Sequence, residues 1–151
     1  MTEPLLHSRS AANAVYFTIA WLRPIGDSPL QFGSKRWSAG APLPYWMPTR
    51  ITGGSTILTD YPVVRIHTVA DSETAVHEAM DRANARMRIL DEDPLADVRM
   101  DDGGTANCLW AEMIEGPRPD PMPYSSVMST DPAAAAVSRL VSTWALAIPL
   151  V

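Results

Sequence analysis

Cysteine and lysine each occur only once in this chain of 151 residues. With Cys108 as the sole cysteine, no internal disulfide can form and no set of thiols can hold a structural zinc. Cys108 stands among apolar neighbours in "NCLWAEMI", where we expect a small buried side chain. Lys35 is the single lysine, the net charge is -5 and the pI is about 5.0. The basic face that nucleic-acid binding requires is therefore not expected.

Long hydrophobic runs are also missing. The apolar stretch "AVYFTIAWL" at 14–22 is far shorter than the roughly 20 residues that span a bilayer. It follows Glu3 rather than a basic cluster and lacks a cleavage site, so it does not resemble a signal peptide. We expect a soluble protein made in a reducing compartment. The length and a hydrophobic content of 46% predict one domain, residues 1–151, with a true core.

The acidic residues are distributed unevenly. Between Asp71 and Asp102 ten carboxylates stand against four arginines, so this segment carries -6 and the remainder +1. The simpler interpretation is a solvated helix face with adjoining turns. The alternative is a surface that repels DNA, which would suit a protein that DNA must pass without adhering.

The first third predicts a helix followed by a long arm. Residues 11–23 favour a helix that Ser10 or Asn13 caps and that ends before Pro24. Its apolar residues fall on nearly every face, so its own domain or a neighbouring subunit should bury it. The proline-rich arm at 24–48 is too long to be a simple connection.

Two interpretations of the arm stay open. Either its tryptophans pack on the core as an ordered cover, or the arm grips a neighbouring subunit, because aromatic residues and arginine dominate interface energetics. On the second interpretation the predicted interface residues are Lys35, Arg36, Trp37, Tyr45, Trp46 and Arg50.

Two strands and a helix are predicted in the middle of the chain. Residues 45–52 favour a strand that Pro48 confines to a sheet edge, with a turn at Gly53-Gly54. Residues 61–70 form a β-rich run. Its two faces carry Val64, Ile66 and Thr68, and Val63, Arg65, His67 and Val69.

The most regular pattern lies just beyond. Asp71 or Ser72 caps a helix that ends before Asp91, with Pro94 as the stop. Apolar residues recur at three- and four-residue spacing, which predicts the buried face. They are Val76, Met80, Ala83, Met87 and Leu90.

The last third is less regular. Residues 96–115 predict a hairpin with an Asp-Asp-Gly-Gly turn, and proline at every second position from 117 to 123 predicts an extended, unpaired segment at 116–132. Asp131-Pro132 before four alanines is typical of a helix start. The β-branched and aromatic content nevertheless favours a strand at 138–148.

No catalytic, cofactor or metal site is predicted. The chain has no Gly-x-Ser-x-Gly elbow, P-loop or dinucleotide fingerprint. His67 and His77 lie ten residues apart across the strand-helix junction, near Asp60 and Asp71, without the close spacing of metal ligands. The carboxylates cluster in turns, where solvation rather than a shifted pKa is expected.

Four motifs occur in an order that resembles one protein family. They are "AWLRP", "KRW-x-x-G-x-PLPY-x-M-x-TRI-x-G", "DYPVV-x-IHT" and "DPL-x-DV", within residues 14–115. Together they resemble the tail terminator proteins of siphophages, whose tails are long and non-contractile, and most closely those of actinobacterial phages such as mycobacteriophages. The chain after Gly116, with its polyalanine stretch, departs from the family pattern.

The resemblance implies an α+β subunit with a mainly antiparallel sheet and helices packed on one face. It implies a non-enzymatic virion protein of the tail-neck region, made in the bacterial host cytoplasm. The partners it implies are copies of the chain itself in a hexameric ring, the major tail tube protein and the head-completion or stopper protein. Such a ring stops tube polymerisation, joins tail to head, and lets genomic DNA pass through its lumen without specific binding or any membrane contact.

Two other functions remain open. An adaptor or stopper protein of the phage neck would share the size, the acidity and the lack of catalytic residues. A small α+β enzyme or ligand-binding domain that uses His67 would belong to another class. A nucleic-acid binder is disfavoured by the pI and the single lysine.

Overall fold

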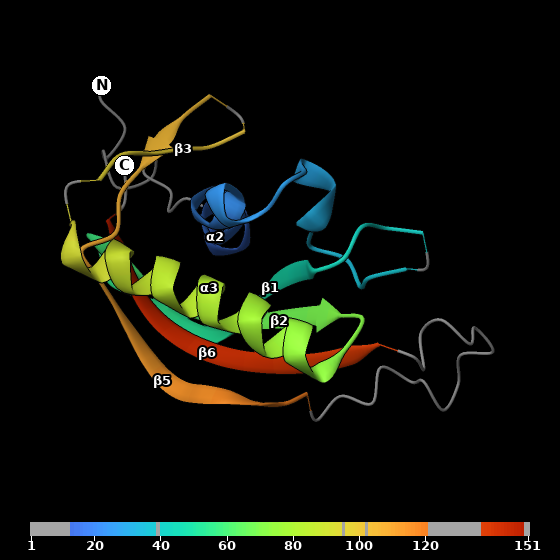
Figure 1. Cartoon of the computed structure of the whole chain (residues 1–151). Helices are drawn as coiled ribbons and strands as arrows, with labels where there is room; N and C mark the ends of the chain where they lie inside the picture. Colours follow the sequence, from blue (N-terminus) through green and yellow to red (C-terminus); the bar gives the residue numbers. More distant parts are fainter. Residues whose placement is uncertain (1–12, 39, 95, 102, 121–136, 150–151) are drawn as a thin grey trace, which may run out of the picture.

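The computed structural model describes residues 13–38, 40–94, 96–101, 103–120 and 137–149. Their fold is α+β, as predicted, with a four-stranded antiparallel sheet in the order β1-β2-β6-β5. Helices α2 and α3 pack on the same side of that sheet (Figure 1). The strands are β1 (Tyr45–Ser55), β2 (Thr59–Ala70), β5 (Trp110–Pro119) and β6 (Ser138–Pro149), and the helices are α2 (Ala14–Leu22) and α3 (Glu73–Glu92).

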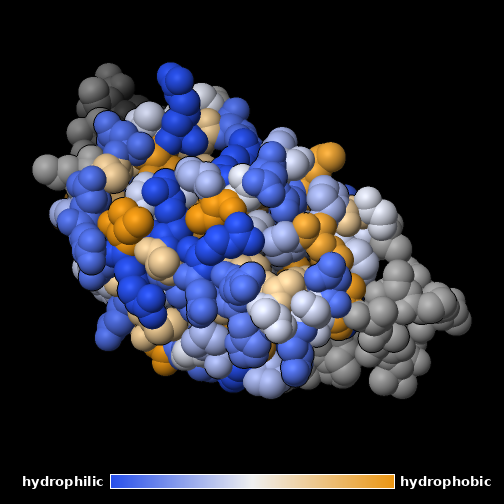
Figure 2. All heavy atoms as spheres, in the orientation of Figure 1, coloured by the Kyte–Doolittle hydropathy of each residue, from blue (hydrophilic) through white to orange (hydrophobic). Residues whose placement is uncertain are grey.

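Helix α3 confirms the predicted pattern. Ser72 rather than Asp71 caps it, because the Ser72 hydroxyl accepts a hydrogen bond from the Ala75 amide at 3.1 Å. All five predicted apolar residues are buried against the sheet. The helix runs to Glu92, two residues into the acidic run, and Asp93 caps its end. Figure 2 shows that the outward side is mainly hydrophilic, so the acids there form a solvated helix face.

Helix α2 is held on α3 by one reciprocal contact. The Asn13 side chain accepts hydrogen bonds from the amides of Val15 and Tyr16 and so begins the helix. Near its end, the Trp21 indole N–H donates to the Arg86 carbonyl, and the Arg86 Nε donates to the Trp21 carbonyl, both at 2.8 Å. The guanidinium also lies 3.6 Å from the indole centroid, a cation-π geometry. The apolar helix is therefore buried within its own domain.

The hairpin of β1 and β2 corrects one prediction. Strand β1 lies at the sheet edge, as Pro48 requires, but it continues through Gly53 and Gly54 to Ser55. The turn lies beyond, where the Thr56 amide donates to the Thr59 carbonyl at 2.8 Å. Gly53 is needed inside the strand because its φ is +114° and a Cβ there would meet the Tyr61 carbonyl oxygen. Glycine therefore marks a close approach of two strands, and not the turn.

The strand favoured at the C-terminus is confirmed as β6, the central partner of β2 and β5. Its even-numbered residues from Leu140 to Ile148 face the helices and are buried. Asn84 of α3 faces them, and its side-chain oxygen accepts from the Ser142 hydroxyl at 2.8 Å and from the Trp144 indole at 3.0 Å. This buried amide therefore joins helix and sheet.

Two predictions for the last third are wrong. The Asp-Asp-Gly-Gly turn joins only the short strands β3 (Val98–Arg99) and β4 (Thr105–Ala106), and the longer strand β5 pairs instead with β6. Residues 116–119 are not unpaired, because β5 includes them at the sheet edge. A register shift between Glu115 and Arg118 spans Pro117, and Pro119 pairs with Leu140. The rest of the 116–132 segment beyond Asp120 and the alanines at 133–136 lie outside the described residues.

Replacing Asn84 should cost stability without a change of fold class. In Asn84→Leu the Ser142 hydroxyl and the Trp144 indole stay buried without an acceptor, so we expect a loss of about 2–4 kcal/mol in the free energy of unfolding. Urea denaturation measures it. Arg88→Ala, exposed on the same helix, is the control and should change stability by less than about 0.5 kcal/mol. Equal effects of the two variants would contradict the role given to Asn84.

Candidate functional site

Two of the predicted interface residues, Tyr45 and Trp46, are buried in the structure. Trp46 is fully buried, stacks on Phe32 with 5.0 Å between ring centroids, and donates its indole N–H to the Ala79 carbonyl. Tyr45 is buried too, with its hydroxyl donating to the Lys35 carbonyl at 2.7 Å. Both side chains therefore pack within their own subunit, which favours the first interpretation of the arm, an ordered cover on the core. Large aromatic side chains serve cores and interfaces equally well, and the sequence pattern does not separate these uses.

The remaining predicted residues have different environments. Trp37 is half-buried on the core cluster of Tyr45 and Met47, and its indole donates to the Ala41 carbonyl. Arg50 forms a bidentate ion pair with Asp60, at 2.8 and 2.9 Å. Lys35 and Arg36 are exposed. The arm thus covers the core with its tryptophans and presents two consecutive cations outward.

The face of the sheet opposite the helices is polar at its centre. Arg65 on β2, Thr143 on β6 and Glu115 on β5 form one row across three strands. Arg65 Nε and Thr143 Oγ1 are buried and make no hydrogen bond with any residue that the structure describes. Buried polar atoms are seldom left unpaired, so water or another chain should supply the missing partners.

His67 is the centre of a hydrogen-bonded chain on that face. Its Nδ1 lies 3.0 Å from the Asp120 carboxylate and its Nε2 lies 3.2 Å from the Thr49 hydroxyl. The side chains of His67 and Asp120 are only 8% and 1% exposed. Hydroxyl, imidazole and carboxylate in this order resemble a nucleophile with its general base.

The carboxylate beside His67 is not one that the sequence indicated. Asp60 pairs with Arg50, and Asp71 is an exposed residue before α3. Asp120 instead follows the end of β5 and reaches His67 across β6. Only the sheet order brings these strands together, so no local spacing could have identified the pair. His7 lies outside the described residues.

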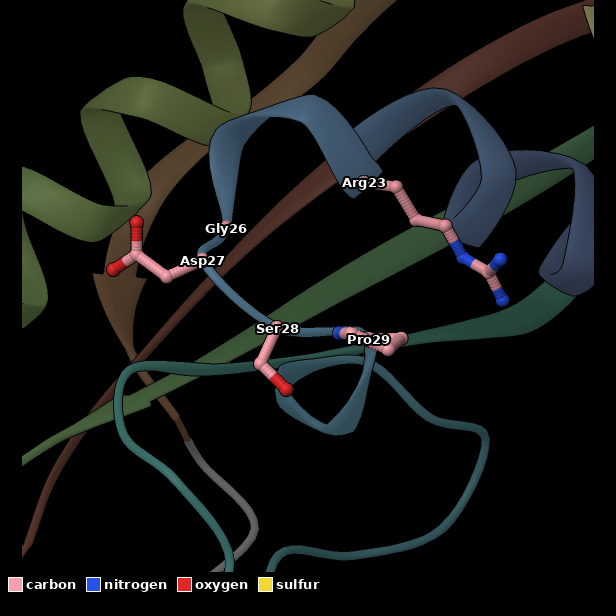
Figure 3. A pocket seen from close by; sticks show the side chains of 5 residues that line it. All are labelled: Arg23, Gly26, Asp27, Ser28 and Pro29. Atoms are coloured by element: carbon pink, nitrogen blue, oxygen red, sulfur yellow. The ribbon is translucent and has the colours of Figure 1, made fainter.

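Neither of two surface pockets contains this histidine. One of about 320 Å³ lies between the start of α3, the end of β5 and the start of β6, and its lining residues include Glu73, His77, Arg118 and Arg139. The other, of about 150 Å³, adjoins the turns η1 (Arg23–Ile25) and η2 (Pro29–Gln31). Figure 3 shows the side chains of Arg23 and Asp27 pointing in opposite directions there, so they do not converge on a ligand.

Exposed hydrophobic residues gather where the β1-β2 hairpin and the start of β5 meet. Of ten large exposed hydrophobic residues in the described part of the chain, seven lie on β1, β2, β5 and their connections. Ile57 and Leu58 in the turn are 64% and 60% exposed. The hairpin-end patch, as we call it, comprises Ile57, Leu58, Tyr61, Leu109 and Trp110. Tyr61 and Trp110 are in ring contact, with centroids 6.2 Å apart.

The patch is continuous across β6. Trp110 pairs in register with Ala147, and Thr59 pairs with Pro149. Only the small Ala147 of β6 therefore lies between Tyr61 on β2 and Trp110 on β5, so their two rings can make contact. Apolar patches of this kind usually mark an interaction site.

Comparison with known proteins leaves the family of the chain undetermined. No protein-family model matches the sequence, and no curated protein matches it. Among the described residues, no three metal-ligating side chains are grouped closely enough to hold an ion. A search of the same residues for a helix suited to crossing a membrane finds none.

Cys108 allows a test of its local environment through pH. Burial raises the pKa of its thiol above the ordinary value of 9.0. Above that pH the unfolded chain loses the proton while the folded chain keeps it, so stability should fall as pH rises. The difference between wild type and Cys108→Ala should change by up to about 1.4 kcal/mol per pH unit between pH 9 and 10. Urea denaturation at each pH measures this difference, and parallel curves would contradict it.

Proposed function

We propose that this chain is a tail terminator subunit, one of six in a ring that caps the head-proximal end of a phage tail tube. In this role it stops tube polymerisation and presents a surface to the head-completion protein. The observation that carries the proposal is the hairpin-end patch, because a monomer rarely leaves so many large apolar residues exposed at one place.

The positions of the resembling motifs in the fold also support the proposal. In "AWLRP" the tryptophan is Trp21, which fixes α2 on α3, and the second motif covers the arm and β1 up to Gly53. "DYPVV-x-IHT" is β2, the second strand of the sheet. These residues hold the fold together, so a protein that shares them in order is expected to share the architecture. The function carries over as an inference from the architecture and the exposed patch.

Capping of tail tubes is the direct test. Purified protein mixed with pre-formed siphophage tail tubes should bind one end of each tube as a ring and stop elongation when more tube subunits are added. Negative-stain microscopy and light scattering measure the ring and the tube length.

The neck adaptor or stopper reading makes a different prediction in the same experiment. Such a protein would leave tube length unchanged and would bind a portal ring or an already terminated tail. Tubes that continue to grow with the protein present would therefore contradict the terminator proposal.

One observation favours an enzyme or ligand-binding domain as a second candidate, namely the chain Thr49, His67 and Asp120. Against catalysis, His67 and Asp120 are almost fully buried and neither described pocket includes them. We therefore expect the wild-type protein to show no activity toward model acyl esters, and we expect His67→Asn to change only its thermal stability. Measurable esterase activity that His67→Asn abolishes, with Thr49→Val doing the same, would favour the second candidate.

A further inference from the structure

Carboxylates border the hairpin-end patch. Asp91 accepts a hydrogen bond from the Ala111 amide at 2.9 Å, and the Asn107 side chain donates to the Pro94 carbonyl at 3.2 Å. These two bonds hold the end of α3 beside the start of β5, where Glu92 and Asp93 are exposed. Asp91, Glu92 and Asp93 are three consecutive carboxylates at this end of α3. This end of the molecule is therefore apolar with an acidic border.

The arm that leads into the start of β1 has exposed cations and an exposed apolar side chain. The arm at 33–43 leads directly into Tyr45, whose hydroxyl holds the Lys35 backbone. Lys35 and Arg36 are exposed, and Leu30 nearby is 70% exposed. The eleven residues of β1 separate this basic end from the hairpin turn by about 35 Å. In Figure 1 the arm projects beyond the end of the sheet.

We propose that copies of this chain associate head to tail, with the basic arm end of one subunit docked on the acidic, apolar hairpin-end patch of the next. This inference rests on the proposed ring, and it names the two surfaces that meet. Lys35 and Arg36 face the carboxylates of the neighbour, Glu92 and Asp93 above all, and Leu30 lies against the apolar residues of the patch.

Charge and symmetry both favour a second copy as the occupant. A closed ring of identical subunits requires a heterologous contact, in which two different surfaces meet. The chain has two such surfaces at opposite ends of β1, with Lys35 and Arg36 exposed at one and Glu92 and Asp93 exposed at the other. If the same ends met, the carboxylates of one copy would face those of the other, which costs affinity. A head-to-tail contact avoids that repulsion at every interface.

The single lysine permits a direct test. A carbodiimide joins an ammonium to a carboxylate that it contacts, and Lys35 is the only lysine. A mixture of nitrogen-15 and unlabelled protein, assembled alone or on tail tubes, should yield mixed-isotope cross-links from Lys35 to Glu92 or Asp93. Mass spectrometry identifies them. Cross-links from Lys35 of one copy mainly to other carboxylates, or no cross-link between copies, would overturn the proposal.

Charge reversal gives an independent test. Lys35→Glu/Arg36→Glu gives the arm end the same charge as Glu92 and Asp93, and Glu92→Lys/Asp93→Lys gives those two positions the same charge as Lys35 and Arg36. Each variant alone should associate at least about tenfold more weakly than wild type. An equimolar mixture should assemble again, because every contact then pairs opposite charges in an alternating ring. Glu78→Lys/Asp81→Lys, which makes the same charge change on the exposed side of α3, is the matched control and should associate like wild type.

The apolar part of the contact has its own variant. Ile57→Ser/Leu58→Ser changes only exposed side chains, so folding by circular dichroism should be unchanged while association weakens. Size exclusion with light scattering measures association for all variants. Reversal variants that assemble normally, or a mixture that fails to recover while both components are folded, would overturn the docking.

Failure here is distinguishable from failure of the proposed function. A ring that caps tubes while Lys35 cross-links elsewhere keeps the terminator proposal and overturns this one. Head-to-tail cross-links in a protein that ignores tubes would support the contact and contradict the terminator proposal.

Discussion

Three tryptophans that donate to α3 hold the whole structure together. Trp46 from β1, Trp21 from α2 and Trp144 from β6 give their indole N–H groups to Ala79, Arg86 and Asn84, over about two turns of the helix. Each indole buries a large apolar surface and at the same time satisfies its one donor, which a buried tryptophan needs. Because the three come from different elements, they fix the positions of α2, the edge strand and the central strand relative to one helix.

This arrangement decides which surfaces are left for other uses. The core lies between the helices and one face of the sheet, so the opposite face and the two ends of β1 carry the remaining features. The centre of the opposite face is polar and partly buried, with the His67 and Asp120 pair and the Arg65 row. The ends are exposed and differ in charge. A subunit whose ends differ in this way is suited to repeat along a line or a ring, and less suited to enclose a substrate.

The sequence predicts the elements better than their connections. Helix α3 and strand β2 follow from periodicity, because regular burial of one face leaves a regular pattern. Strand β6 follows instead from its β-branched and aromatic content. The sequence wrongly predicts a turn at Gly53, because glycine can mark a turn or a close backbone approach, and only the nearby Tyr61 carbonyl distinguishes them. Pairing of β5 with β6 joins residues some 30 apart in the chain, so local pattern cannot reveal it. The burial of Trp46 is hidden for the same reason, since its partner Ala79 lies 33 residues away in the chain.

The central claim is that the subunit folds completely on its own and assembles through the two ends of β1. Hydrogen exchange on the free protein and on protein bound at a tube end tests this most directly. We expect new protection at residues 33–36, 56–58 and 109–110, with protection in α3 unchanged between the two states. New protection confined to the polar face around Arg65 and Thr143, with both ends still exchanging freely, would contradict it.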